Sequence, residues 1–80
     1  MGTVQRRVLV TGALGQIGME LLQALSVKHG SENVIATDIR DSTGLENTEI
    51  KFIKLDVLNK EELERVIEDL EINEIYHLAA

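Results

Sequence analysis

The 80-residue sequence contains no cysteine, no proline and only two histidines. Without cysteine, the chain can form neither a disulfide framework nor a thiolate metal site. The histidines have no matching carboxylate cluster, so the sequence suggests no metal site of another kind. No proline-rich linker, internal repeat or second domain is visible in these 80 residues. A chain of this length forms one small domain at most and buries only roughly 60–65% of its unfolded surface, so marginal stability is expected.

Basic residues and long apolar runs are also scarce. Eight Lys and Arg stand against 14 Asp and Glu, which gives a net charge of −6. A nucleic-acid binder would gather Lys and Arg on one face, so nucleic acid is not an expected partner. No apolar run approaches the ~18 residues of a membrane span, so a membrane is not expected either. Arg6-Arg7 before the apolar residues 8–10 resembles a signal peptide, but the run breaks at Thr11, and a cytoplasmic location is expected.

The first half of the chain predicts a strand, a helix and a second strand. Residues 8–11 are apolar and β-branched, as in a strand covered on both faces. Apolar residues at one-face helical spacing then predict a helix from Gln16 to about His29, which Gly30 terminates. Residues 34–37 form the second predicted strand, which ends at Asp38.

The second half begins with a polar loop over residues 40–49 that has no periodicity. Residues 50–55 alternate apolar side chains with lysine, which predicts a third strand near the edge of the sheet. Asn59 can cap a helix whose apolar stripe runs from Leu63 to Leu70. Residues 74–78 predict a fourth strand.

This order of elements, β-α-β-β-α-β, favours an α/β fold with a parallel sheet and right-handed crossovers. The link between the second and third strands is too short for an ordinary crossover helix. Either a short helix lies within residues 40–49 or the crossover there is irregular.

The most informative segment, Thr11 to Gly18, joins the first strand to the first helix and carries glycines at positions 12, 15 and 18. Gly12 allows a tight turn. Gly15, without a Cβ, lets a pyrophosphate approach the backbone, and Gly18 lets the helix pack closely on the sheet. The helix N-terminus offers free N–H groups and partial positive charge to phosphates. The alternative is a glycine-rich turn without a ligand, but strand and helix stand where a Rossmann-type dinucleotide site requires them.

Asp38 lies twenty residues beyond Gly18, where a carboxylate can accept hydrogen bonds from the adenosine ribose. It would repel a 2′-phosphate, so the cofactor expected is NAD rather than NADP. Its alternative role is that of an Asp in a turn after a strand. Arg40 would soften this preference if it folded back over the ribose, but we interpret it as a solvated loop charge.

The ends of the third and fourth strands supply further candidates. Asp56 can reach the adenine amino group while Val57 packs on the ring; alternatively, Asp56 simply ends the strand. In strand order 3-2-1-4, the small Ala79-Ala80 pair leaves room for a cofactor, unless it is ordinary packing. Tyr76 and His77 are interpreted as packing residues, since Tyr76 has Ala80, not lysine, four residues on.

Taken together, these residues resemble the extended short-chain dehydrogenase/reductase family, which includes nucleotide-sugar epimerases and dehydratases. The matching motifs are Thr11-Gly12-x-x-Gly15-x-x-Gly18, Asp38, Asp56-Val57 and His77-Leu78-Ala79-Ala80. Within the family, Gly15 to Gly18 and residues 32–40 are similar to the L-threonine 3-dehydrogenase branch, since epimerases more often carry an aromatic residue in place of Gln16.

The resemblance implies that residues 1–80 are the front half of a Rossmann-type doubly wound sheet with strand order 3-2-1-4. It implies cofactor contacts at Gly12, Gly15, Gln16, Ile17, Gly18, Asp38, Asp56, Val57 and Ala80. The family's catalytic Ser or Thr and Tyr-x-x-x-Lys would lie beyond Ala80, so no residue here is assigned a catalytic role, and the 80 residues alone should be inactive. A small-molecule substrate and a homodimer are expected only of a full-length protein. Two alternatives remain: the front half of an epimerase or dehydratase, and a non-catalytic NAD-binding module.

Overall fold

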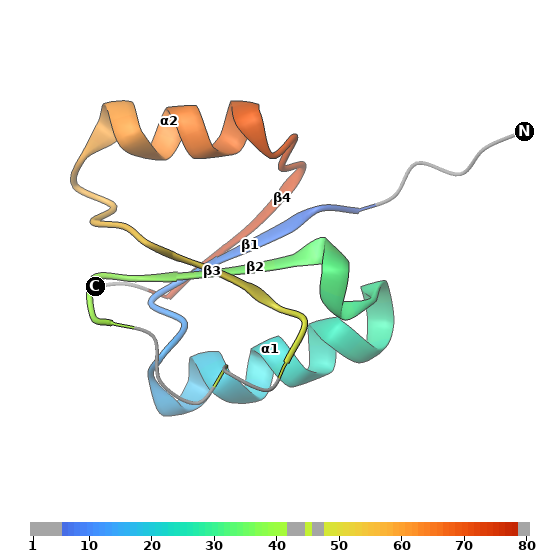
Figure 1. The fold of residues 1–80 in the computed structure, drawn as a ribbon. Helices are drawn as coiled ribbons and strands as arrows, with labels where there is room; N and C mark the ends of the chain where they lie inside the picture. Colours follow the sequence, from blue (N-terminus) through green and yellow to red (C-terminus); the bar gives the residue numbers. More distant parts are fainter. Residues whose placement is uncertain (1–5, 42–44, 46–47, 79–80) are drawn as a thin grey trace, which may run out of the picture.

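A computed structural model describes residues 6–41, 45 and 48–78 of the chain. Figure 1 shows a sheet with one helix on each face. The elements in chain order are β1 (Val8–Thr11), α1 (Gln16–His29), the 3-10 turn η1 (Ser31–Asn33), β2 (Val34–Asp38), β3 (Lys51–Lys54), α2 (Lys60–Asp69) and β4 (Glu74–His77). No helix among these residues is long and apolar enough to cross a membrane.

The four strands form one parallel sheet in the order β3-β2-β1-β4. This confirms the predicted α/β class, the strand order and the position of the third strand at an edge. Val8 of β1 aligns with Val34 of β2 and with Glu74 of β4, so these three strands begin level, and β2 extends one residue further, to Asp38. Because the strands are parallel, their carboxyl ends meet at one edge of the sheet, where α/β folds bind ligands.

The core lies between the central strands and α1. Every residue of β1 and β2 is buried, as expected of strands whose two faces are both covered. Val8 and Val10 pack with Leu22 and Leu25 of α1 in one cluster. Leu9 alternates to the opposite face, where Figure 1 places α2. The packing on this face is less extensive, since α2 contains no fully buried residue.

Helix α1 ends, and helix α2 begins, where the sequence predicts. Gly30 has a φ of 89° and its N–H bonds the carbonyl of Ser26 at 2.9 Å, which closes α1. Asn59 caps α2 by accepting the N–H of Glu62 at 3.2 Å. The turn η1 was not predicted, because three residues of 3-10 structure leave no periodicity to detect.

The link between β2 and β3 is irregular where it is described. Residues 40, 41, 45, 48 and 49 are not helical, which favours the second of the two predicted alternatives, although residues 42–44 and 46–47 lie outside the described part. Leu45 is buried in the α1 core cluster. The link therefore crosses the α1 face of the sheet and anchors there through one leucine.

Candidate nucleotide-binding site

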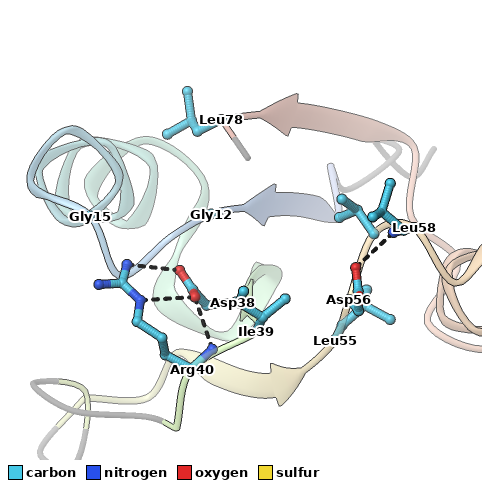
Figure 2. A pocket seen from close by; sticks show the side chains of 10 residues that line it. Gly12, Gly15, Asp38, Ile39, Arg40, Leu55, Asp56, Leu58 and Leu78 are labelled. Atoms are coloured by element: carbon cyan, nitrogen blue, oxygen red, sulfur yellow. Dashed lines mark hydrogen bonds and ion pairs between the residues drawn. The ribbon is translucent and has the colours of Figure 1, made fainter. Parts of the chain in front are cut away.

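A cavity of about 470 Å³ opens at the carboxyl edge of the sheet. It is lined by the residue that directly follows each of the four strands, namely Gly12, Ile39, Leu55 and Leu78. Figure 2 shows this cavity with Asp38 and Arg40 on one side of it and Asp56 on the other. The remaining lining residues are Gly15, Val57 and Leu58.

A second hollow adjoins the first around the glycine-rich loop. It is lined by Gly12, Gly15, Gln16, Ile17, Gly18 and Leu78. Gly12, Gly15 and Leu78 line both hollows, so the two form one crevice that passes the N-terminus of α1. Ile17 is 72% exposed in this part of the crevice.

The glycine-rich loop is fixed to the end of β2 by two hydrogen bonds. The N–H of Ala13 donates to the carbonyl of Thr37 at 3.0 Å. The N–H of Leu14 donates to Oδ2 of Asp38 at 3.1 Å. Asp38 therefore has a structural task in addition to facing the cavity: it holds the loop that precedes α1.

The glycines at 12 and 15 differ in what requires them. Gly12 has a φ of 67°, which other residues rarely adopt, so the predicted tight turn is confirmed. Gly15 has a φ of −73°, and a Cβ there would meet nothing closer than the carbonyl oxygen of Gly12 at 3.8 Å. Nothing within the described chain requires glycine at position 15. Its hydrogen atom faces a space that an external ligand can fill.

Gly18 is required by packing inside the chain. A Cβ added there would lie 2.5 Å from the carbonyl oxygen of Ala13 and within 2.8 Å of its Cα. Close packing of Gly18 on the sheet was predicted, but its nearest neighbour is instead the Ala13 backbone of the glycine-rich loop.

The N-terminus of α1 can receive an anion. Its first turn contains no acidic residue, and no side chain caps it. The first N–H groups of a helix have no partner within the helix and carry partial positive charge. Phosphate oxygens beside Gly15 would meet these groups with no carboxylate in the first turn of α1 to repel them.

Asp38 is paired with Arg40, contrary to our interpretation of Arg40 as a solvated loop charge. Oδ1 of Asp38 accepts the backbone N–H of Arg40 at 3.0 Å and its Nε at 3.1 Å. Oδ2 accepts Nη2 of Arg40 at 3.2 Å. The Asp38 side chain is 4% exposed and that of Arg40 is 61% exposed. The arginine thus covers the carboxylate from the solvent side.

These contacts predict a pH dependence of folding. The guanidinium of Arg40, followed by two backbone N–H groups, lowers the pKa of Asp38 from 3.8 to about 2, although burial opposes this. A carboxyl group whose pKa is lower in the folded state stabilises the fold above its unfolded pKa. This contribution is lost as the pH falls through the folded pKa. We expect Asp38→Asn to destabilise the chain by about 1 kcal/mol at pH 6, allowing for solvent around Arg40. In urea unfolding, that difference should shrink between about pH 4 and pH 2; a constant difference would contradict it.

Asp56 combines a turn with a place at the cavity. Its Oδ1 accepts the N–H of Leu58 at 2.9 Å, which shapes the turn between β3 and α2 (Figure 2). The side chain is otherwise exposed, and both Asp56 and Val57 line the cavity. The two interpretations of Asp56 left open by the sequence are therefore compatible.

Tyr76 and His77 differ from each other in their surroundings. Tyr76 packs against the α1 core cluster, and its hydrogen bond with Glu74 raises the pKa of the phenol. A raised pKa keeps the phenol protonated near neutral pH, so it is poorly suited to act as a general base. His77 is exposed, and its Nδ1 lies 2.8 Å from Oγ1 of the buried Thr11. This contact ties β4 to β1 beside the glycine-rich loop and was not predicted from the sequence.

The structure brings most of the predicted site residues together. Eight line the crevice: Gly12, Gly15, Gln16, Ile17, Gly18, Asp38, Asp56 and Val57. Ala80 lies outside the described residues. Four apolar lining residues were not predicted: Ile39, Leu55, Leu58 and Leu78. For Ile39 and Leu55, the available signal was their position directly beside Asp38 and Asp56.

Residues 8–80 match the family model of the NAD-dependent epimerase/dehydratase family. An uncharacterized epimerase/dehydratase of Staphylococcus haemolyticus is 39% identical over 77 residues, which is 92% of this chain and 24% of that protein. The chain therefore spans about a quarter of the length of this curated relative.

Two solved L-threonine dehydrogenases have the same fold. The enzyme from Clostridium difficile superposes with a TM-score of 0.85 at 35% identity, over 98% of this chain and 25% of that one. A monomeric L-threonine 3-dehydrogenase from a metagenome gives 0.81 at 46% identity, over 91% of this chain and 23% of that one. With a family match that runs from the first strand to the last residue, the chain belongs to the NAD-dependent epimerase/dehydratase family.

Proposed function

We propose that the crevice binds NAD and that residues 1–80 are a cofactor-binding part of a Rossmann-type domain. Gly15 carries the proposal: the chain itself does not require glycine there, yet the position faces the crevice at an uncapped helix N-terminus. A pyrophosphate beside Gly15 would place the adenosine toward Asp38 and Asp56. The nicotinamide would then lie toward Ile17 and Leu78, in the second hollow.

The reaction we propose for the protein that carries this chain is the oxidation of L-threonine. The hydroxyl-bearing carbon gives a hydride to NAD and the hydroxyl gives up a proton, which yields 2-amino-3-ketobutyrate and NADH. The two L-threonine dehydrogenases similar to this chain support the proposal. The residues described here bind and orient the cofactor. By resemblance, the residues that move the proton lie outside them.

An epimerase or dehydratase acting on a nucleotide sugar is the second candidate. It is supported by the relative from Staphylococcus haemolyticus, which is described as an uncharacterized epimerase/dehydratase; the nucleotide sugar is part of the proposal. Such an enzyme would return the hydride to its substrate and so would not accumulate NADH.

Absorbance of NADH separates the two candidates. The protein that carries residues 1–80 is mixed with NAD and either L-threonine or D-threonine. We expect NADH to accumulate only with L-threonine. Conversion of a nucleotide sugar without accumulation of NADH, together with no reaction on L-threonine, would replace the first candidate with the second.

A further inference from the structure

Asp38 has no free acceptor site toward the cavity. Each of its two oxygens already accepts two hydrogen bonds: Oδ1 from the backbone N–H and Nε of Arg40, and Oδ2 from Leu14 N–H and Nη2 of Arg40. An ionised carboxylate offers about four acceptor sites in total. A ribose that donates hydrogen bonds to Asp38 must therefore displace donors that are present.

The four donors are not equally easy to displace. The N–H groups of Leu14 and Arg40 belong to the backbone, and the first of them fixes the glycine-rich loop. The other two belong to the Arg40 guanidinium, whose side chain is 61% exposed and can return to solvent. Figure 2 shows this side chain curled back onto Asp38 at the cavity wall. The guanidinium is the partner that a ribose can replace without moving the loop.

We propose that Arg40 sets the affinity for the cofactor, because its guanidinium competes with the adenosine ribose for Asp38 and must leave the carboxylate before the ribose can bind there. This inference rests on the proposed function, because it takes the cavity as the adenosine end of an NAD site. The guanidinium holds the carboxylate in the free protein. The ribose hydroxyls take over its two side-chain hydrogen bonds when the cofactor enters.

The test uses adenosine, which has the ribose hydroxyls but no charge. Loss of the Arg40 charge cannot weaken adenosine binding through long-range attraction of phosphate, as it could for NAD. We expect Arg40→Gln to lower the dissociation constant for adenosine by about three- to tenfold, since the shorter, uncharged amide can replace at most one of the two guanidinium hydrogen bonds. The constant is measured by NMR titration, which reaches millimolar affinities. With 2′-deoxyadenosine the gain should be smaller.

Lys54→Gln is the matched control. Lys54 also pairs with an aspartate at 3.1 Å, with the same 61% side-chain exposure, but its partner is Asp41 and it does not line the cavity. This variant should bind adenosine as the unsubstituted protein does. Unchanged or weaker adenosine binding by Arg40→Gln, in a protein that binds NAD, would overturn the inference alone. An unsubstituted protein that does not bind NAD would overturn the proposed function and the inference with it.

Discussion

Gly15→Ala is expected to weaken NAD binding by about tenfold or more while leaving the stability of the fold unchanged. The added methyl group meets no atom of the chain closer than 3.8 Å, so the fold accommodates it. It occupies the space where the pyrophosphate would approach the helix N-terminus. Loss of one or two charge-assisted hydrogen bonds there accounts for the expected effect.

Unlike Gly15→Ala, which leaves the stability of the fold unchanged, Gly18→Ala is expected to lower that stability. Its methyl group would lie 2.5 Å from the carbonyl oxygen of Ala13, and backbone atoms cannot yield as a side chain does. Overpacking of this kind costs about 1–3 kcal/mol, of which the better helix propensity of alanine returns up to ~1 kcal/mol.

The two glycine variants are compared by urea unfolding and by calorimetric titration with NAD. Gly18→Ala should lower the free energy of unfolding, and Gly15→Ala should lower only the affinity. If Gly15→Ala unfolds the protein or binds NAD normally, position 15 does not face the cofactor in the proposed way.

The second large effect is expected at Asp38. Asp38→Ala should raise the dissociation constant for NAD roughly 5- to 150-fold, through loss of the ribose hydrogen bonds. This corresponds to about 1–3 kcal/mol of binding free energy. The constant for NADP should rise less, because a negative charge that repels the 2′-phosphate is lost and Arg40 is freed to meet that phosphate.

Asp38→Asn separates the anchoring task of Asp38 from its charge. The amide oxygen can still accept the N–H of Leu14, so the glycine-rich loop should keep its position. Calorimetric titration of each variant with NAD and NADP provides the measurement. Equal losses of affinity for NAD and NADP in both variants would show that Asp38 does not recognise the ribose hydroxyls.

The local elements were predictable because each carries its own signal. The buried strand β1, the helix α1 and its stop at Gly30 follow from apolar spacing and one glycine. The third strand was predicted one residue too long at each end, since Ile50 and Leu55 continue its apolar pattern outside Lys51–Lys54. The strand order 3-2-1-4 was predicted as that of the Rossmann-type sheet implied by the family resemblance.

The contacts of the site were less predictable because they join distant residues. The bond from Leu14 to Asp38 spans 24 residues, and that between Thr11 and His77 spans 66. No periodicity encodes such pairs. Arg40 is different, since it lies only two residues from Asp38. We misjudged it because a charged side chain in a polar loop is usually solvated.

The central claim is that NAD lies along the crevice from Asp38 past Gly15. The most direct test is an NMR titration of the isotope-labelled protein with NAD, in which backbone amide shifts are assigned. The account predicts saturable shifts at Gly12, Gly15, Ile17 and Ile39, with little change at Val27, which is exposed on α1 outside the crevice. Saturable shifts that avoid the glycine-rich loop, or no shifts at millimolar NAD, would contradict it.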